Sequence, residues 1–181
     1  MRRFNLLQRP VFQANMTFLY HMMKASESLL LIARQMTMDP FLKTYYDNHL
    51  EEERGHAQWL QRDLIEGGFD FAAIPREAIL MAGVQYYLLF HVSPASLLGY
   101  MAVLELTPMP MEQIAALEAA YGVAALRTLR YHAEHDVDHG RDLLSFIESR
   151  PTHEQAAIME SASQACYFMN AAMPDMEISN G

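Results

Sequence analysis

Signals for helix boundaries recur along this chain, and signals for β-strands are nearly absent. Asp39-Pro40 and Ser93-Pro94 each place an N-capping residue before a proline, which is a common start of an α-helix. Gly67-Gly68 supplies the glycine that often follows a helix C-terminus. These signals restrict the chain to an all-α fold, in which helices bury their apolar faces against one another.

The apolar periodicity between these signals predicts seven helices. We expect them at residues 11–36, 40–66, 75–90, 94–106, 111–121, 123–149 and 153–172, with a capping box of Thr152 and Gln155 starting the last. Short connections between helices are typical of a compact bundle. No linker, repeat or low-complexity tract divides residues 1–181, so we expect a single domain with a loosely ordered tail at 174–181.

The composition limits the classes of partner. The formal net charge of -9 argues against nucleic acids and anionic membranes, because both would repel the chain. The longest apolar runs fall far short of the roughly 20 residues that span a bilayer. The N-terminus lacks the hydrophobic region of a signal peptide, so we expect a cytoplasmic protein. Cys166 is the only cysteine, and its apolar helical context predicts a buried, inert thiol.

Fourteen methionines are spread along the chain, mostly at helical spacing. Methionine is unbranched and polarizable, so it fills irregular gaps between helices. We expect most of them to fill the core and a minority to line an adaptable pocket.

Three potential metal ligands share one face of the helix expected at 123–149. His132, Asp136 and His139 are spaced four and then three residues apart, which places them within an arc of roughly 60°. Two imidazoles and a carboxylate suit a first-row transition metal such as iron. His135 and Asp138 fall at the flanks of this stripe. A polar helix face without a metal is the alternative interpretation.

The helix expected at 40–66 offers a second set of ligands. His49, Glu53 and His56 lie within about 60° on a helical wheel, and Glu52 lies at the edge of that stripe. A charged face toward solvent is the alternative. Gly55 inside a helix costs about 1 kcal/mol relative to alanine, which suggests a close approach beside His56.

Glu105 is a third source, because it closes a nearly unbroken apolar run. A buried carboxylate is costly unless it is paired, protonated or bound to a cation. The alternative is a side chain that points to water from the end of its helix. The three helices together supply enough carboxylates and imidazoles for a pair of irons. The spacing differs from the ferritin type, which needs two Glu-x-x-His motifs where this chain has one.

Three motifs together resemble the heme-oxygenase-like diiron oxidases, in the same structural clan as TenA and PqqC. They are Glu52-Glu53-Arg-Gly-His56, the apolar helix that ends in Leu104-Glu105, and His132-x-x-x-Asp136-x-x-His139. The resemblance covers residues 40–150 and implies a compact bundle of about seven helices. The metal ligands that it implies are Glu53, His56, Glu105, His132, Asp136 and His139. His49 stands where some members place a carboxylate.

The resemblance implies a non-heme, O2-dependent oxidase or oxygenase with two Fe per chain. Dioxygen is the expected cosubstrate, an external donor supplies electrons, and the small-molecule substrate is a metabolite derived from an amino acid or a fatty acid. Lys24, Arg34 and Arg62 are candidate anchors for a substrate carboxylate. The chain is shorter than many relatives, so a second subunit in a homodimer is an expected source of substrate enclosure.

Two other classes of function stay open. A metal-free hydrolase or oxidase like TenA or PqqC would use histidine and glutamate as acid–base groups. A TenA-like enzyme is expected to use a thiol nucleophile, and the apolar context of Cys166 argues against that. A noncatalytic helical binding protein would have no need of three ligands in register. Heme binding is disfavoured, because no proximal histidine stands out in the first helix, although His21 is a candidate.

Overall fold

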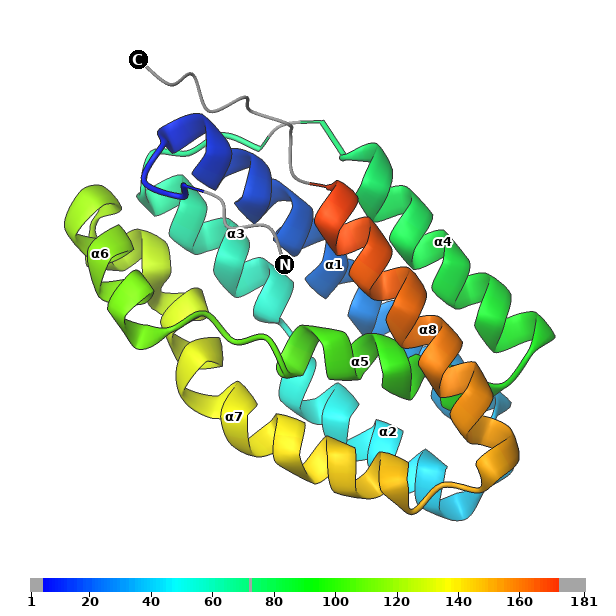
Figure 1. The fold of residues 1–181 in the computed structure, drawn as a ribbon. Coiled ribbons are helices and arrows are strands. Elements are labelled where there is room, and N and C mark those ends of the chain that lie inside the picture. The colour runs from blue at the N-terminus through cyan, green and yellow to red at the C-terminus, as the bar shows by residue number, and fades with distance from the viewer. Residues whose placement is uncertain (1–4, 72, 173–181) are drawn as a thin grey trace.

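The computed structural model describes residues 5–71 and 73–172, and this part of the chain is entirely helical (Figure 1). Its helices, in chain order, are α1 (Arg9–Met36), α2 (Pro40–Glu53), α3 (His56–Glu66), α4 (Arg76–His91), the 3₁₀ helix η1 (Pro94–Ser96), α5 (Leu97–Glu105), α6 (Met111–Tyr121), the 3₁₀ helix η2 (Val123–Leu126), α7 (Arg127–Glu148) and α8 (Thr152–Ala171). The predicted all-α class is therefore confirmed. No helix among these residues is both long enough and apolar enough to cross a membrane. The tail predicted at 174–181 lies outside the described residues.

Side-chain caps form where the sequence indicates two of the helix starts. One carboxylate oxygen of Asp39 accepts hydrogen bonds from the backbone N–H groups of Phe41 and Leu42 at the start of α2. Ser93 Oγ accepts one from the N–H of Ala95 ahead of α5. Each cap satisfies backbone donors that the first turn of a helix leaves without partners.

The capping box predicted at the start of α8 is absent. Pro151 occupies the N-cap position, and no side chain caps the helix there. Thr152 is already the first helical residue, so its hydroxyl is not placed to cap. The side chain of Gln155 instead donates a hydrogen bond to the carbonyl oxygen of Arg150.

The second predicted helix, at residues 40–66, is two helices in the structure. α2 ends at Glu53 and α3 begins at His56, because Gly55 has a left-handed backbone with φ of 88°. Glycine adopts this conformation without the steric strain that a Cβ would cause. A Cβ on Gly55 would meet only ordinary contacts, at 3.8 Å from Trp59 and 3.9 Å from Gln58. The break in the helix, and not a close approach, therefore explains the glycine. Because one predicted helix is two in the structure, the described residues form eight α-helices where seven helices were predicted.

The short helix α5 lies in the middle of the bundle and packs against α7 and α8 (Figure 1). Gly99 brings the backbones of α5 and α8 close together. A Cβ at this position would lie 1.9 Å from the carbonyl oxygen of Ile158 and 2.8 Å from the backbone nitrogen of Ala162. This packing fixes the position of α5, and therefore of Glu105 at its end.

Two clusters of buried apolar side chains form the core. The first is built mainly from α1, α2, α4, α5 and α8 and includes Leu30, Tyr46, Met81, Leu97 and Ile158. The second is built mainly from α1, α3, α6, η2 and α7 and includes Phe12, Met16, Leu60, Ile114 and Leu126. Burial of apolar surface, worth about 25 cal/mol per Å², is the main force that holds these helices together.

Cys166 is exposed on α8, so the prediction of a buried thiol is wrong. The buried face of α8 runs through Ala157, Ile158, Ser161 and Ala165. Each helical residue is rotated by about 100° from the one before it, so the side chain after Ala165 leaves that face. Apolar neighbours in sequence do not by themselves indicate burial on a helix.

Candidate metal centre

The break between α2 and α3 brings a carboxylate and an imidazole together. Glu53 ends α2 and His56 begins α3, and Glu53 Oε2 lies 3.3 Å from His56 Nδ1. His132 of α7 completes the group: one ligand atom from each of the three residues lies within 4.8 Å of the others. Ligand atoms that share a first-row ion at about 2 Å lie up to about 4 Å apart. The three residues therefore need only small shifts to bind one ion.

Buried nitrogens without partners mark this group. His56 is only 3% exposed. Neither His56 Nδ1 nor His132 Nε2 forms a hydrogen bond within the described part of the chain. Buried polar atoms are nearly always hydrogen-bonded, so two unsatisfied ring nitrogens beside one carboxylate require an explanation. A metal ion provides one, because a neutral imidazole nitrogen binds a cation through its lone pair.

His49 and Glu105 form a second buried pair. His49 Nε2 lies 3.0 Å from Glu105 Oε1, and both side chains are 8% exposed. Neither Glu105 oxygen has a hydrogen bond of normal geometry to a described residue. Glu105 is therefore buried, as its apolar context predicts. The sequence signal for His49 is its place on one stripe with Glu53, although the predicted ligand set does not include it.

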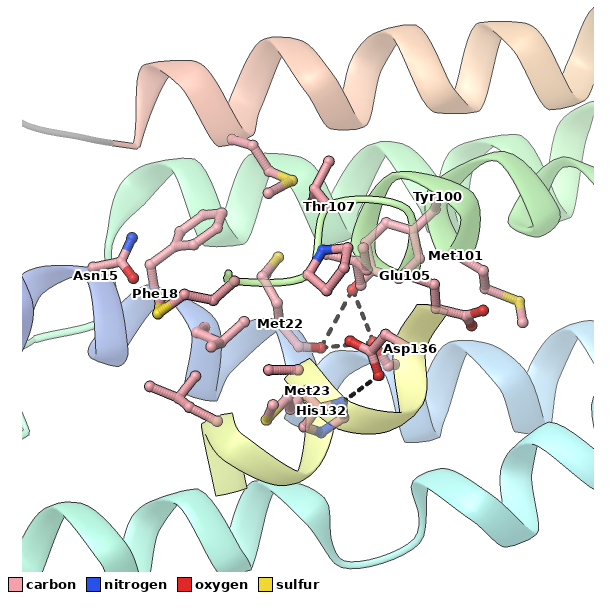
Figure 2. Close-up of a pocket in the computed structure, with 18 of the residues that line it drawn as sticks. Asn15, Phe18, Met22, Met23, Tyr100, Met101, Glu105, Thr107, His132 and Asp136 are labelled. Atoms are coloured by element: carbon pink, nitrogen blue, oxygen red, sulfur yellow. Dashed lines mark hydrogen bonds and ion pairs between the residues drawn. The ribbon is translucent and has the colours of Figure 1, made fainter. Parts of the chain in front are cut away.

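His132 is oriented by a carboxylate on its own helix. Asp136 Oδ1 lies 3.0 Å from His132 Nδ1, and Figure 2 shows this contact between the two side chains of α7. Such carboxylate–imidazole pairs fix the tautomer and the ring orientation of histidines that bind metals. Because the contact occupies Nδ1 of His132, Nε2 is the ring nitrogen left available as a ligand atom. Of the two flanking residues, His135 is exposed, whereas the side chain of Asp138 lies outside the described part.

His139 does not join the Glu53, His56 and His132 group among the described residues. It is half-buried and lies two helical turns after His132, about 10 Å along α7. The adjacent Gly140 packs against the end of α5, where a Cβ would lie 3.4 Å from the carbonyl oxygen of Glu105. The predicted stripe of His132, Asp136 and His139 thus starts in the group of Glu53, His56 and His132 (the Glu53 group) and runs along α7 toward Glu105.

The charges of the centre favour a bound cation. Burial lowers the pKa of both His49 and His132, but the neighbouring carboxylates, chiefly Glu105 and Asp136 respectively, outweigh it and raise both pKa values. Burial raises the pKa of Glu53, but three nearby histidines outweigh it and lower that pKa. A buried site that holds protons on imidazoles has a negative potential. Metal ions bind such sites by displacing the protons.

A cavity of about 860 Å³ opens beside the centre, and its polar end is lined by His49, Glu53, Glu105, His132 and Asp136 (Figure 2). Its remaining wall is mainly apolar and includes Phe18, Met22, Leu104 and Leu129. These side chains belong to both core clusters or pack against them, so the cavity lies where the clusters meet. The volume is within the usual range of small-molecule sites.

The three cationic side chains predicted to anchor a substrate carboxylate do not line this cavity in the described part of the chain. Lys24 and Arg62 are exposed. Arg34 is paired with Asp47, with its Nε 2.6 Å from a carboxylate oxygen. These residues are therefore not placed to hold a substrate beside the centre.

The structure is thus a helical bundle that places buried carboxylates and histidines beside a mainly apolar cavity. The chain belongs to a family of iron-containing redox enzymes, whose model matches residues 16–169. Its fold is similar to that in the crystal structure of a domain of unknown function with a heme oxygenase-like fold from Shewanella denitrificans. The TM-score is 0.69 and the sequence identity is 15%, and the alignment covers 90% of this chain and 75% of that chain. No curated protein matches the sequence. The predicted family resemblance and the heme-oxygenase-like fold are thus confirmed.

Proposed function

We propose that this protein is a non-heme diiron oxidase or oxygenase that uses O2 to oxidise a small metabolite with a substantial apolar part. The observation that carries the proposal is the set of buried donor atoms without hydrogen bonds: His56 Nδ1, His132 Nε2 and both oxygens of Glu105. Carboxylate oxygens and imidazole nitrogens suit iron. Iron held by these atoms would supply the one-electron steps and the O2 chemistry that side chains lack.

The proposed ligand set consists of Glu53, His56, Glu105, His132, Asp136 and His139. Glu53, His56 and His132 are assigned to one iron because their ligand atoms already lie close together. Glu105, Asp136 and His139 are assigned to the second. We assign His49 as an ion-pair partner that orients Glu105, since its Nε2 is 3.0 Å from that carboxylate.

The remaining chemistry falls to this chain's own residues. Asp136 holds the proton on His132 Nδ1 and so keeps Nε2 available as a donor atom. The apolar wall, which includes Phe18 and Leu104, excludes water from a bound substrate and strengthens charge interactions beside the centre. An external electron donor would be a partner of the protein, because the reduction of O2 consumes electrons that a catalytic cycle must resupply.

The test is an anaerobic Fe(II) titration of the apoprotein, with metal analysis and Mössbauer spectroscopy before and after O2 is added. We expect two irons per chain and rapid consumption of O2. Glu53→Gln and Glu105→Ala should each lose at least one iron. Glu51→Gln is the matched control, because the Glu51 side chain is 76% exposed and pairs only with Arg54 among the described residues. Absence of iron uptake at micromolar concentrations would overturn the proposal.

A metal-free acid–base enzyme is the second candidate, and the His132–Asp136 pair favours it. An imidazole oriented by a carboxylate is a common general base, and both residues line the cavity. A thiol nucleophile finds no support, because Cys166 is exposed on α8 and is not among the described cavity residues. Turnover that persists in the presence of a strong iron chelator would favour this candidate over the diiron oxidase.

A further inference from the structure

Two aromatic side chains contact the histidines of the Glu53 group. The indole ring of Trp59 lies 4.4 Å from the imidazole of His56, measured between ring centroids. The ring of Tyr131 lies 5.4 Å from His56 and 5.8 Å from His132. Trp59 and Tyr131 are also 5.7 Å from one another. The two aromatic rings and the two imidazoles therefore form one contiguous group.

This aromatic group reaches the surface of the protein. Trp59 is 37% exposed. Together with Tyr131 it lines a second, open pocket of about 410 Å³, formed by α3 and the start of α7, that is separate from the cavity beside the centre. Electron transfer between redox groups slows steeply with distance, so a chain of rings in contact is a fast route. Trp59 and Tyr131 thus connect the histidine end of the centre with solvent.

The cavity beside the centre is rich in sulfur that an oxidant would damage. Five methionines line the cavity: Met22, Met23, Met101, Met109 and Met169. Oxidation to the sulfoxide turns a flexible apolar side chain into a polar one and disrupts packing. A centre that becomes oxidised without a substrate therefore has oxidisable sulfurs in the wall of the adjoining cavity.

We propose that Trp59 and Tyr131 form an electron relay, which carries electrons from a reductant at the surface pocket to an oxidised iron centre and so reduces that centre. This inference rests on the proposed diiron function. Trp59 gives one electron to the centre through His56 and becomes a radical cation. Tyr131 returns one electron to Trp59 and releases its phenolic proton to water in the surface pocket. A one-electron reductant of the thiol or ascorbate class then returns one electron, with one proton from water, to the tyrosyl radical.

Tyr45 provides a matched control on the other side of the centre. Its ring is stacked nearly parallel to His49 at 6.2 Å and to Phe146 at 4.3 Å. It is therefore about as close to a histidine of the site as Tyr131 is. It is half-buried and does not line the surface pocket among the described residues. A relay that needs access to an external reductant should use Tyr131 and not Tyr45.

The first measurement tests the contact without O2 or turnover. Trp59 is the only tryptophan, so its fluorescence reports on this site alone. Anaerobic addition of Fe(II) should quench it, and metal analysis should give the same iron content in the wild type, Trp59→Phe and Tyr131→Phe. If iron does not bind, the proposed function fails and the relay fails with it. If iron binds and fluorescence is unchanged, only the relay is overturned.

The second measurement follows the radicals and the damage. Iron-loaded protein is mixed with O2 in the absence of substrate, frozen rapidly and examined by EPR, with deuterated tyrosine or tryptophan identifying the radical. We expect a tyrosyl signal that is lost in both Trp59→Phe and Tyr131→Phe and retained in Tyr45→Phe. Mass spectrometry should show faster oxidation of Met22 and Met101 in the two relay variants. Two results would overturn the relay and leave the proposed function intact. One is O2 consumption with no loss of a tyrosyl signal and no faster methionine oxidation in the two relay variants. The other is that both effects occur in Tyr45→Phe instead.

Discussion

Replacing Gly99 with alanine is expected to destabilise the bundle, although alanine is normally the better helix former. The new Cβ would lie 1.9 Å from the carbonyl oxygen of Ile158, and Cβ contacts in real proteins essentially never fall under 3.0 Å. The obstacle is backbone, which cannot rotate aside as a side chain can. α5 and α8 must therefore separate locally by about 1 Å.

The cost of that separation exceeds the gain in helix propensity. Alanine in place of glycine gains at most about 1 kcal/mol inside a helix. Overpacking costs about 1–3 kcal/mol, and a gap of about 1 Å loses up to half of the dispersion energy between the separated atoms. We expect a net loss of about 2 kcal/mol in the free energy of unfolding. For a chain of this length that corresponds to a fall of about 6 °C in Tm.

Gly83 is the matched control, because it lies inside α4 and a Cβ there would meet nothing within 4 Å. Gly83→Ala should stabilise the protein by about 0.5–1 kcal/mol. Urea and thermal unfolding of both metal-free variants, followed by circular dichroism, give the two differences. Equal stability of Gly99→Ala and Gly83→Ala would refute the reasoning, since propensity alone would then account for both.

Three further substitutions test other parts of the fold. Asp63→Ala should lower the free energy of unfolding in urea by about 3 kcal/mol, because Asp63 accepts buried hydrogen bonds from both the backbone N–H and the hydroxyl of Thr128. A decrease of less than about 0.5 kcal/mol would contradict this. Gly55→Ala should cost about 1 kcal/mol through its left-handed backbone alone, and an unchanged Tm would show that the break tolerates a side chain. The hydrogen bond from Arg150 lowers the pKa of Asp39 from 3.8. The ionised carboxylate therefore stabilises the fold above about pH 3.8 and loses this effect as the pH falls below it, so Asp39→Asn should flatten the stability profile between about pH 5 and pH 3.

The sequence predicts helix ends better than it predicts the path of the chain between them. Asp39 and Ser93 cap helices because a capping bond depends on residues two or three positions away. Gly55 is ambiguous in the sequence, since the same glycine is compatible with a weakened continuous helix or with a break. Cys166 is exposed and not buried as predicted, because no local signal in the sequence fixes which face of α8 packs inward.

The candidate site was predictable to the extent that ligands lie in register along single helices. His132 and Asp136 are close in space because they are one turn apart on α7. The contact between His49 and Glu105 depends instead on how α2 and α5 pack, which spacing within one helix does not determine. The contacts of Trp59 with the site likewise depend on how the break at Gly55 turns α3 toward α7, so no pattern in the sequence pointed to them.

The ligand set would also join the adjacent helices α2 and α3 to two helices, α5 and α7, that are distant from them in sequence. Glu53, His56, Glu105 and His132 belong to α2, α3, α5 and α7, so one centre would close loops of up to roughly 80 residues. An ion that binds only the folded chain adds about 2.7 kcal/mol of stability at a free concentration 100 times its Kd. Iron would then act as a reversible cross-link. The lifetime of the protein against proteolysis, and with it the amount present, would follow the supply of iron.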